Sequence, residues 1–215
     1  MKPIYIQTVT ATNKLPVGSS RWWGNPDLPI DLEYPTYIDA EGDVVEMNFV
    51  CQINLAEIAE LSPDIKLPHT GLLSFFAKID PYLGELSYED CIRSNISNPE
   101  DIKVLYFENT EKQEEIVLVD EEGEEVSPKE RAILFSDKKE SYQADHGLLM
   151  PPDHRHTESW KSPYERWEIL LQVDSCEEDD FTLNFIDSGV LDFLISPRDL
   201  ENHRFDNVRA VVLSS

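Results

Sequence analysis

Two stretches of the chain share one pattern of apolar and polar positions. FVCQIN at residues 49–54 leads to GLLSFF at 71–76, and ILLQVD at 169–174 leads to GVLDFL at 189–194. Glycine follows glutamine after 19 positions in the first stretch (52 to 71) and after 17 in the second (172 to 189). Matching residue types at matching spacing predict an internal duplication.

Within each stretch, apolar residues alternate with polar ones, which is typical of a strand with one buried face. In the first copy this face is predicted to hold Met47, Phe49, Cys51 and Ile53, and in the second Trp167, Ile169, Leu171 and Val173. The two strands end on Asn54 and Asp174. Gly71 and Gly189 each precede a second strand, and we expect both to occupy turns that need a positive φ.

Further elements follow from local signals. Apolar runs predict strands at residues 102–107, 116–120, 131–135 and 208–213. Asn54, followed by Glu57, predicts a capping box and a short helix, and Ser196 before Pro197 predicts a helix over about 197–203. Residues 108–130 carry ten acidic side chains around IVLV, which indicates a solvated hairpin with charged edges.

These elements predict a mainly β fold with a few short helices (α+β). We expect roll-like mixed or antiparallel sheets built from the internal duplication. No flexible linker divides the chain, so residues 1–215 are expected to form a single domain of two similar halves, with repeat units at about 47–78 and 167–200.

The excess of acidic side chains limits the classes of partner that we expect the protein to bind. Against 43 acidic side chains stand 18 basic ones, a formal net charge of −25. Such a field repels nucleic acids and anionic lipids and attracts basic proteins, although the same charge also keeps a protein soluble. The first twenty residues lack the apolar run of a signal peptide, so we expect a cytoplasmic protein. The three cysteines are odd in number and widely spaced, which favours reduced thiols.

Several motifs together resemble the YwqG-like family of bacterial proteins. They are SRWWGNPDLPIDLEYP, FVCQINLAEIAEL, LPHTGLLSFF, HGLLMPP, WEILLQVDS and SGVLDFLISPRDL, in an order that spans residues 20–200. Trp22, Trp23, Tyr34 and Met150 depart from the family pattern. The resemblance implies a mainly β, roll-like fold with an internal repeat. The family has no established activity, so the resemblance implies little about function.

One polar cluster offers metal-binding chemistry. Within a dozen residues stand Asp145, His146, Asp153, His154 and His156, and histidine with carboxylate can bind zinc. Two of these histidines lie only two positions apart beside a pair of prolines, with no cysteine nearby, which favours an exposed loop over a metal site. His146 matches the family histidine, which implies a fixed structural or binding role. We expect no cofactor.

Arg21, Trp22, Trp23 and Asp27 are binding candidates, because aromatic faces and a cation suit partner recognition. The alternative is that the tryptophans plug one end of the β core, and this alternative is favoured because large aromatics are usually buried. Gln52 and Gln172, at equivalent positions, are expected to tie the two halves together through amide hydrogen bonds. Asp174 completes the candidate set.

No nucleophile motif or phosphate-binding loop is present. The sequence therefore favours a non-enzymatic cytosolic module whose acidic surface binds a basic protein partner, with an immunity-like role as one version. The alternative is a hydrolase or metal-dependent enzyme that uses residues 146–156. The oligomeric state is left open by the sequence.

Overall fold

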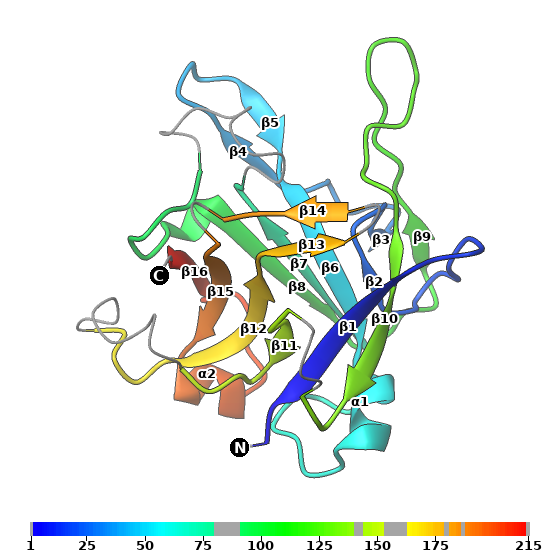
Figure 1. The fold of residues 1–215 in the computed structure, drawn as a ribbon. Coiled ribbons are helices and arrows are strands. Elements are labelled where there is room, and N and C mark those ends of the chain that lie inside the picture. The colour runs from blue at the N-terminus through cyan, green and yellow to red at the C-terminus, as the bar shows by residue number, and fades with distance from the viewer. Residues whose placement is uncertain are drawn as a thin grey trace.

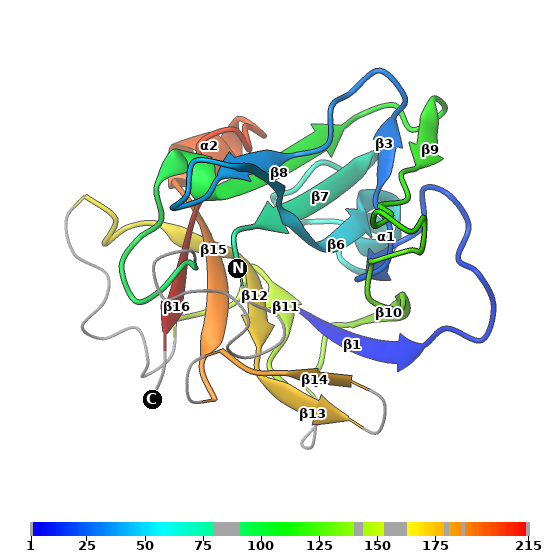
Figure 2. The same ribbon diagram turned by 90° about the horizontal axis from the view of Figure 1, so that it is seen from above.

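The main element of the protein is an antiparallel sheet that curves into a nearly closed barrel (Figures 1 and 2). The computed structural model describes residues 2–79, 91–139, 144–152, 163–178, 181–185 and 188–213. The strands of the sheet are β1 (Ile4–Thr10), β2 (Arg21–Trp22), β6 (Asn48–Asn54), β7 (Leu72–Ala77), β8 (Ile102–Phe107), β10 (Arg131–Ser136), β11 (Gly147–Leu148), β12 (Glu168–Asp174), β15 (Val190–Ile195) and β16 (Arg209–Leu213). The predicted mainly β class is confirmed.

The ten strands lie in the order β16-β15-β12-β11-β1-β10-β2-β6-β7-β8. Thus β1 and β10 form the centre, and four strands flank them on each side. In the described part of the chain, three two-stranded sheets accompany the barrel: β3 (Asp27–Pro29) with β9 (Gln113–Glu115), β4 (Thr36–Ile38) with β5 (Val44–Glu46), and β13 (Cys176–Glu178) with β14 (Phe181–Leu183). Every strand pair is antiparallel.

The two flanks match in register. Gln52 pairs with Ser74 across β6 and β7, and Gln172 pairs with Asp192 across β12 and β15. Each pair of strands also has one irregularity, and it falls at the same place, just before Cys51 in one flank and just before Leu171 in the other. The geometry agrees with the repeat that the sequence pattern indicates, while descent from a duplication stays a prediction.

The irregularities change which side chains face the core. Phe49 packs in an outer apolar cluster, whereas Val50 and Cys51 both belong to the main core. The single buried face expected along this strand is therefore wrong, because Met47 and Phe49 do not share a face with Cys51 and Ile53. A β-bulge sets two residues against one on the partner strand and so exchanges the two faces of the strand beyond it. Leu170 occupies the matching position in β12.

The main core fills the inside of the barrel. Phe75 and Phe193 come from strands that are far apart in the sheet, yet their ring centroids are 5.1 Å apart. Trp22 and Trp23 are 0% and 2% exposed in the same core. The sheet is thus held in its curved shape by apolar contacts across its interior, which are the dominant stabilising contribution in folds of this kind.

One end of the sheet is covered by an irregular segment. Ser97 donates from its backbone N–H to Ala210 O at 2.7 Å and accepts the N–H of Ala210 on its Oγ at 2.9 Å. Val212 donates to Arg93 O at 2.9 Å. The backbone groups of β16 are therefore paired, which protects this strand from adding to the sheet of another molecule.

Two short α-helices and a 3₁₀ helix (Pro99–Asp101) complete the described elements. Helix α1 (Leu55–Leu61) begins after Asn54, whose Oδ1 accepts the N–H of Ala56 at 3.1 Å. Glu57 does not close the predicted capping box on Asn54; it accepts the N–H of Ser20 at 3.4 Å. Neither α-helix in this part of the chain has the length and apolarity that a membrane crossing requires.

Helix α2 (Pro197–Glu201) is capped as predicted. Ser196 Oγ accepts the N–H of Asp199 at 3.0 Å. The predicted strands at 102–107, 131–135 and 208–213 also match β8, β10 and β16 closely.

The glycine prediction is half right. Gly71 has φ +96°, as expected for a turn. Gly189 is not in the positive-φ region, and the left-handed residue there is Ser188, with φ 53°. A Cβ on Gly189 would lie 2.2 Å from Leu213 O, so glycine is needed for a close backbone approach instead.

The strand predicted at 116–120 is wrong. The paired strand ends at Glu115, and residues 116–128 form a projecting loop closed by a single bridge between Val119 and Glu125 (Figure 1). Val117 and Val119 are about half exposed, at 45% and 56%. Their apolar run suggested a strand, but their side chains do not enter the barrel core.

Candidate functional site

A buried ionic network lies on the outer face of the barrel, around Arg21. Strand β2 pairs Arg21 with Gln52 of β6. The Arg21 side chain is 0% exposed, and its Nη2 donates to Asp27 Oδ2 at 3.1 Å and to Pro16 O at 3.0 Å. Its Nη1 donates to Glu130 Oε2 at 3.3 Å and to Asn25 O at 3.1 Å. A buried guanidinium is tolerated here because it is paired and hydrogen-bonded.

Asp27 and Gln52 complete the floor of this network. Gln52 Nε2 donates to Asp27 Oδ2 at 2.5 Å and to Ser19 O at 2.9 Å, while its Oε1 accepts the N–H of Asp27 at 2.9 Å. Asp27 Oδ2 also accepts the N–H of Gly18 at 2.8 Å. These bonds pin both ends of residues 18–27 to the sheet and so fix the position of Arg21.

Carboxylates from a distant part of the chain surround this floor. Asn25 Nδ2 donates to Glu115 Oε1 at 3.2 Å and to Glu125 Oε1 at 2.8 Å. The Glu115 carboxylate forms an ion pair with Lys14. Burial raises the pKa of Glu115, but the hydrogen bonds from Lys14 and Asn25 and the nearby positive charges outweigh it and leave the pKa below its usual value. Glu115 is therefore anionic near neutral pH.

These side chains line a polar pocket of about 400 Å³, here called the Glu115 pocket. Its polar walls are formed by Lys14, Asn25, Glu115, Glu125, Ser127, Lys129 and Glu130. Glu115 and Glu130 are only 15% and 17% exposed. Glu130 Oε1 also accepts the N–H of Leu15 at 2.8 Å. The pocket therefore presents carboxylates that are held in place from below.

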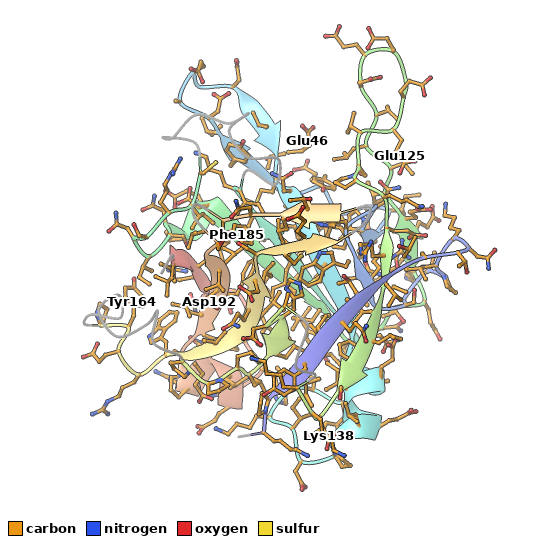
Figure 3. All side chains as sticks on the ribbon, viewed as in Figure 1. Glu46, Glu125, Lys138, Tyr164, Phe185 and Asp192 are labelled. Atoms are coloured by element: carbon orange, nitrogen blue, oxygen red, sulfur yellow. The ribbon has the colours of Figure 1, made fainter. Side chains whose placement is uncertain are left out.

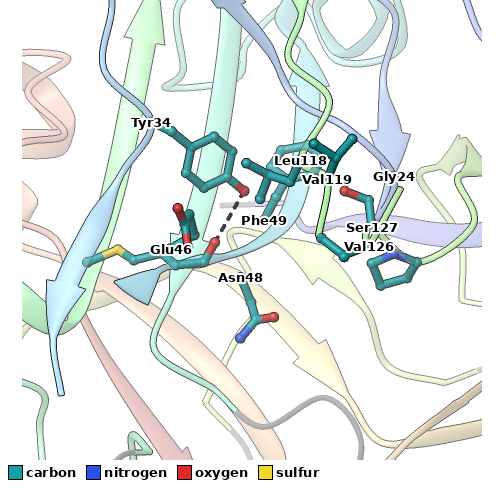
Figure 4. A pocket seen from close by; sticks show the side chains of 11 residues that line it. Gly24, Tyr34, Glu46, Asn48, Phe49, Leu118, Val119, Val126 and Ser127 are labelled. Atoms are coloured by element: carbon teal, nitrogen blue, oxygen red, sulfur yellow. Dashed lines mark hydrogen bonds between the residues drawn. The ribbon is translucent and has the colours of Figure 1, made fainter. Parts of the chain in front are cut away.

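A second pocket, of about 230 Å³, adjoins the first and is here called the Tyr34 pocket (Figure 4). Tyr34 donates from its hydroxyl to Met47 O at 3.2 Å. Phe49, Leu118, Val119 and Val126 supply apolar surface, and Glu46 and Asn48 are polar. The two pockets share Gly24, Ser127 and Pro128. A charged pocket and a pocket of mixed polar and apolar lining thus adjoin one another.

Two arms project from one side of the barrel (Figure 1). The first is the β4–β5 arm, residues 36–46, and the second is the 116–128 arm. Exposed or partly exposed acids near their tips are Asp39, Glu41, Asp43, Asp120, Glu121, Glu122, Glu124 and Glu125. Glu46 and Glu125 mark the two arms in Figure 3. The Tyr34 pocket draws its lining from both arms.

The 116–128 arm has a defined turn. Asp120 Oδ1 accepts the N–H groups of Glu122 and Glu124 at 3.0 and 2.8 Å, and Gly123 has φ +83°. The backbone N–H of Asp120 donates to Glu124 O at 2.9 Å. These local bonds arrange the acidic side chains at the tip without burying them.

The second half carries different chemistry at the matching place. Gln172 Nε2 donates to Asp145 O at 2.6 Å, and Asp174 donates its backbone N–H to His146 Nδ1 at 3.0 Å. The His146 ring faces the barrel interior and lies 4.8 Å from the Trp22 ring, centroid to centroid. Burial lowers the pKa of His146 to about 4, so this imidazole is neutral near pH 7.

The predicted residues are distributed as follows. Arg21, Asp27 and Gln52 are in direct contact, and Trp22 and Trp23 lie in the core beneath them, as the favoured alternative expected. Gln52 and Gln172 do not tie the halves together. Each amide reaches the segment that precedes the short strand of its own half, because its neighbour in the sheet is that strand.

The described residues give no support to a metal site around His146. Asp145 pairs with Lys139, with Nζ 2.6 Å from Oδ1, while His146 is 3% exposed. Among the described residues, no three His, Cys, Asp or Glu side chains gather as a metal site would require. Asp153, His154 and His156 lie outside the described residues.

Sequence reasoning missed Lys14, Asn25, Glu115 and Glu130 as members of one site. Asn25 and Glu115 are ninety positions apart, and only the pairing of β3 with β9 brings them together. The ten acidic residues at 108–130 indicated a charged segment, but the sequence did not show which of their side chains would be buried against the barrel. The side chains of Glu115 and Glu130 are largely buried because Arg21 lies beneath them.

Together these features define a class of protein: a nearly closed antiparallel β barrel with an ionic network and two adjoining pockets on one outer face. A family model described as a domain of unknown function (DUF1963) matches residues 20–156 and 146–212. Since the match extends over most of the chain, the protein belongs to this family. No curated protein matches the chain.

Proposed function

We propose that the protein is a binding module that uses its two arms to hold a basic protein partner. The observation that carries this proposal is the combination of acidic tips with exposed apolar side chains on both arms. Val119 and Val126 are 56% and 52% exposed beside the Tyr34 pocket, and Val44 and Ile38 on the other arm are 66% and 62% exposed. Exposed apolar surface rimmed by charge is typical of an interaction site.

Charge complementarity selects the partner. Five acids stand on residues 120–125, and the whole chain carries a net charge of −25. A basic segment with some apolar side chains would place those side chains in the Tyr34 pocket and its cations beside the arm tips. This arrangement speeds association and excludes acidic competitors. An immunity-like role, in which the arms cover the basic surface of a toxin, is one concrete version.

We also propose a cytoplasmic location and membership of the YwqG-like group within the family, on the motifs given above. The alternative is an enzyme that uses residues 146–156, and nothing in the described part of this segment favours it. His146 is buried against Trp22, and its Nδ1 already accepts a backbone N–H, which leaves that nitrogen unable to take a proton from a substrate without breaking the bond.

The test is partner capture with charge-reversed arms. Native mass spectrometry of the protein recovered from its own cells, at low and at high salt, identifies a basic partner. The triple variant Glu121→Lys, Glu122→Lys, Glu124→Lys is expected to weaken that complex at least about tenfold at low salt, because reversal replaces attraction by repulsion.

The matched control reverses three exposed acids on and near the helices, at the opposite side of the barrel from the arms: Glu60, Asp64 and Glu201. The control has the same net charge as the arm variant. If both triples weaken binding equally, net charge alone drives association and the arms are not the binding surface. If neither weakens it, the proposal is wrong.

A further inference from the structure

Three of the residues that line the Glu115 pocket carry carboxylates. Glu115, Glu125 and Glu130 supply carboxylates, and Asn25, only 4% exposed, supplies an amide at the wall. Asn25 gives both of its described side-chain hydrogen bonds through Nδ2. Its Oδ1 is buried and has no hydrogen-bond partner in the described part of the chain. The carboxylates that line the pocket accept hydrogen bonds and do not donate them, so the lining suits a ligand that brings N–H groups.

The acceptors are held rigidly. Arg21 Nη1 lies 3.3 Å from Glu130 Oε2 and 4.0 Å from Glu115 Oε1, and Arg21 is itself fully buried. The guanidinium therefore fixes the two carboxylates from below and leaves their outer sides toward the pocket. Preorganised groups of this kind bind without a further ordering cost.

The cation already in the pocket is held weakly by comparison. Lys14 reaches Glu115 from an exposed loop, and its side chain is 70% exposed. An exposed ion pair on a flexible side chain contributes little to stability, since solvent screens it and side-chain entropy opposes it. Displacing Lys14 would therefore cost little, whereas displacing Arg21 would break a buried network.

We infer that the Glu115 pocket receives an arginine side chain of the basic partner, and that Lys14 occupies this place in the unbound protein. The inference rests on the proposed function and adds a specific contact to it. A guanidinium carries five N–H donors in a planar fork. Its planar fork can meet two carboxylates at once, which the single ammonium of a lysine does less completely.

The experiment uses L-argininamide as the minimal probe and a nine-residue poly-arginine peptide as the extended one. Calorimetry measures affinity, and the Asn25 side-chain amide signals in NMR report on the pocket itself. Lys14→Gln is expected to raise the affinity for L-argininamide about threefold to tenfold, because the internal competitor is removed. Glu115→Gln is expected to lower it at least about tenfold.

Lys2→Gln is the matched control. Lys2 also forms an exposed ion pair, with Asp137, and its side chain is 61% exposed, so its removal changes the net charge equally but away from the pocket. Equal gains from Lys14→Gln and Lys2→Gln would overturn the inference, because the effect would then be one of overall charge. Unchanged Asn25 signals on addition of L-argininamide would overturn it as well.

The two proposals fail in different ways. If poly-arginine binds and the arm reversal weakens it, but the Asn25 signals stay fixed, the arms bind a basic partner and the pocket takes no arginine. If L-argininamide shifts the Asn25 signals while arm reversal leaves poly-arginine binding unchanged, the pocket is real and the arm surface is wrong.

Discussion

Arg21 and Gly147 occupy equivalent positions in the two flanks of the barrel. Each lies on a two-residue strand and pairs with a glutamine, Gln52 or Gln172. The first flank thus places a guanidinium on the outer face, where the second has no side chain at all. A Cβ on Gly147 would lie 2.6 Å from Met150 Sδ and 2.7 Å from Ile4 O, so no side chain fits there. One backbone plan therefore supports an ionic pocket on one flank only.

The residues just before these two positions, Ser20 and His146, also share a hydrogen-bonding role and differ in chemistry. Ser20 Oγ accepts the N–H of Asn54 at 2.8 Å, and His146 Nδ1 accepts the N–H of Asp174 at 3.0 Å. The acceptor is required in both flanks, because each donor is a backbone N–H at the end of a long strand. The chemistry of the acceptor differs, and only the imidazole can titrate. The flanks share hydrogen-bond geometry and differ in charge.

The largest expected effect comes from removing the charge that sets the first flank apart. Arg21→Met should lower the free energy of unfolding by about 3–5 kcal/mol, because Asp27 would remain buried without its cation. Chemical denaturation at pH 7 measures this. Arg204→Met serves as the control: Arg204 contacts Asp199 at 2.6 Å, but its side chain is 53% exposed, and the loss should stay below about 1 kcal/mol. Equal losses would mean that the Arg21 network contributes no more than a surface pair.

A smaller effect should appear equally in both flanks. Gly71→Ala and Gly189→Ala should each cost about 3 kcal/mol, because the new Cβ would meet Phe107 O at 2.4 Å or Leu213 O at 2.2 Å. Gly42→Ala, at φ +93° with open space around it, should cost only about 1 kcal/mol. Thermal and urea unfolding give the comparison. A Gly189 variant as stable as the wild type would show that the two flanks do not share this close approach.

The smallest effect separates the flanks by pH. Because the pKa of His146 is about 4 when folded and near 6.5 when unfolded, the unfolded state binds the proton more readily. Stability therefore falls as pH drops below about 6.5 and continues to fall until about pH 4. Between pH 6.5 and 5 the loss from this group should be about 2 kcal/mol. His146→Asn should remove that part of the slope, whereas Ser20→Ala should leave the slope unchanged. An unaltered slope in His146→Asn would assign the pH dependence to other groups.

Local signals in the sequence predicted the elements well. The Ser196 cap set the start of α2, and apolar runs placed β8 and β10 to within a residue. The bulges at Val50 and Leu170 could not be foreseen, because a bulge depends on the partner strand and leaves no mark in an apolar run. The run at 116–120 misled for a related reason: its valines have strand propensity, but among the described residues they have no pairing beyond the bridge between Val119 and Glu125.

The site was predictable only in part. Arg21, Asp27 and Gln52 were selected as candidates from their residue types and positions, and they do meet. Arg21 contacts Glu115 and Glu130 across about a hundred positions of sequence. Neither the periodicity of apolar residues nor the spacing of motifs predicts contacts at that separation. Lys14 offered no sequence signal, since an isolated lysine in a loop is ordinary.

The bulge at Val50 divides β6 into two parts whose apolar side chains pack on different sides of the sheet. Before it, Phe49 faces the outer cluster that supports the arms; after it, Cys51 and Ile53 face the inside of the barrel. Deleting Val50 would turn the first part of the strand inside out, sending Phe49 toward the interior and emptying the base of the arms. The loss of one uncharged residue would thereby uncouple the arms from the barrel that carries them.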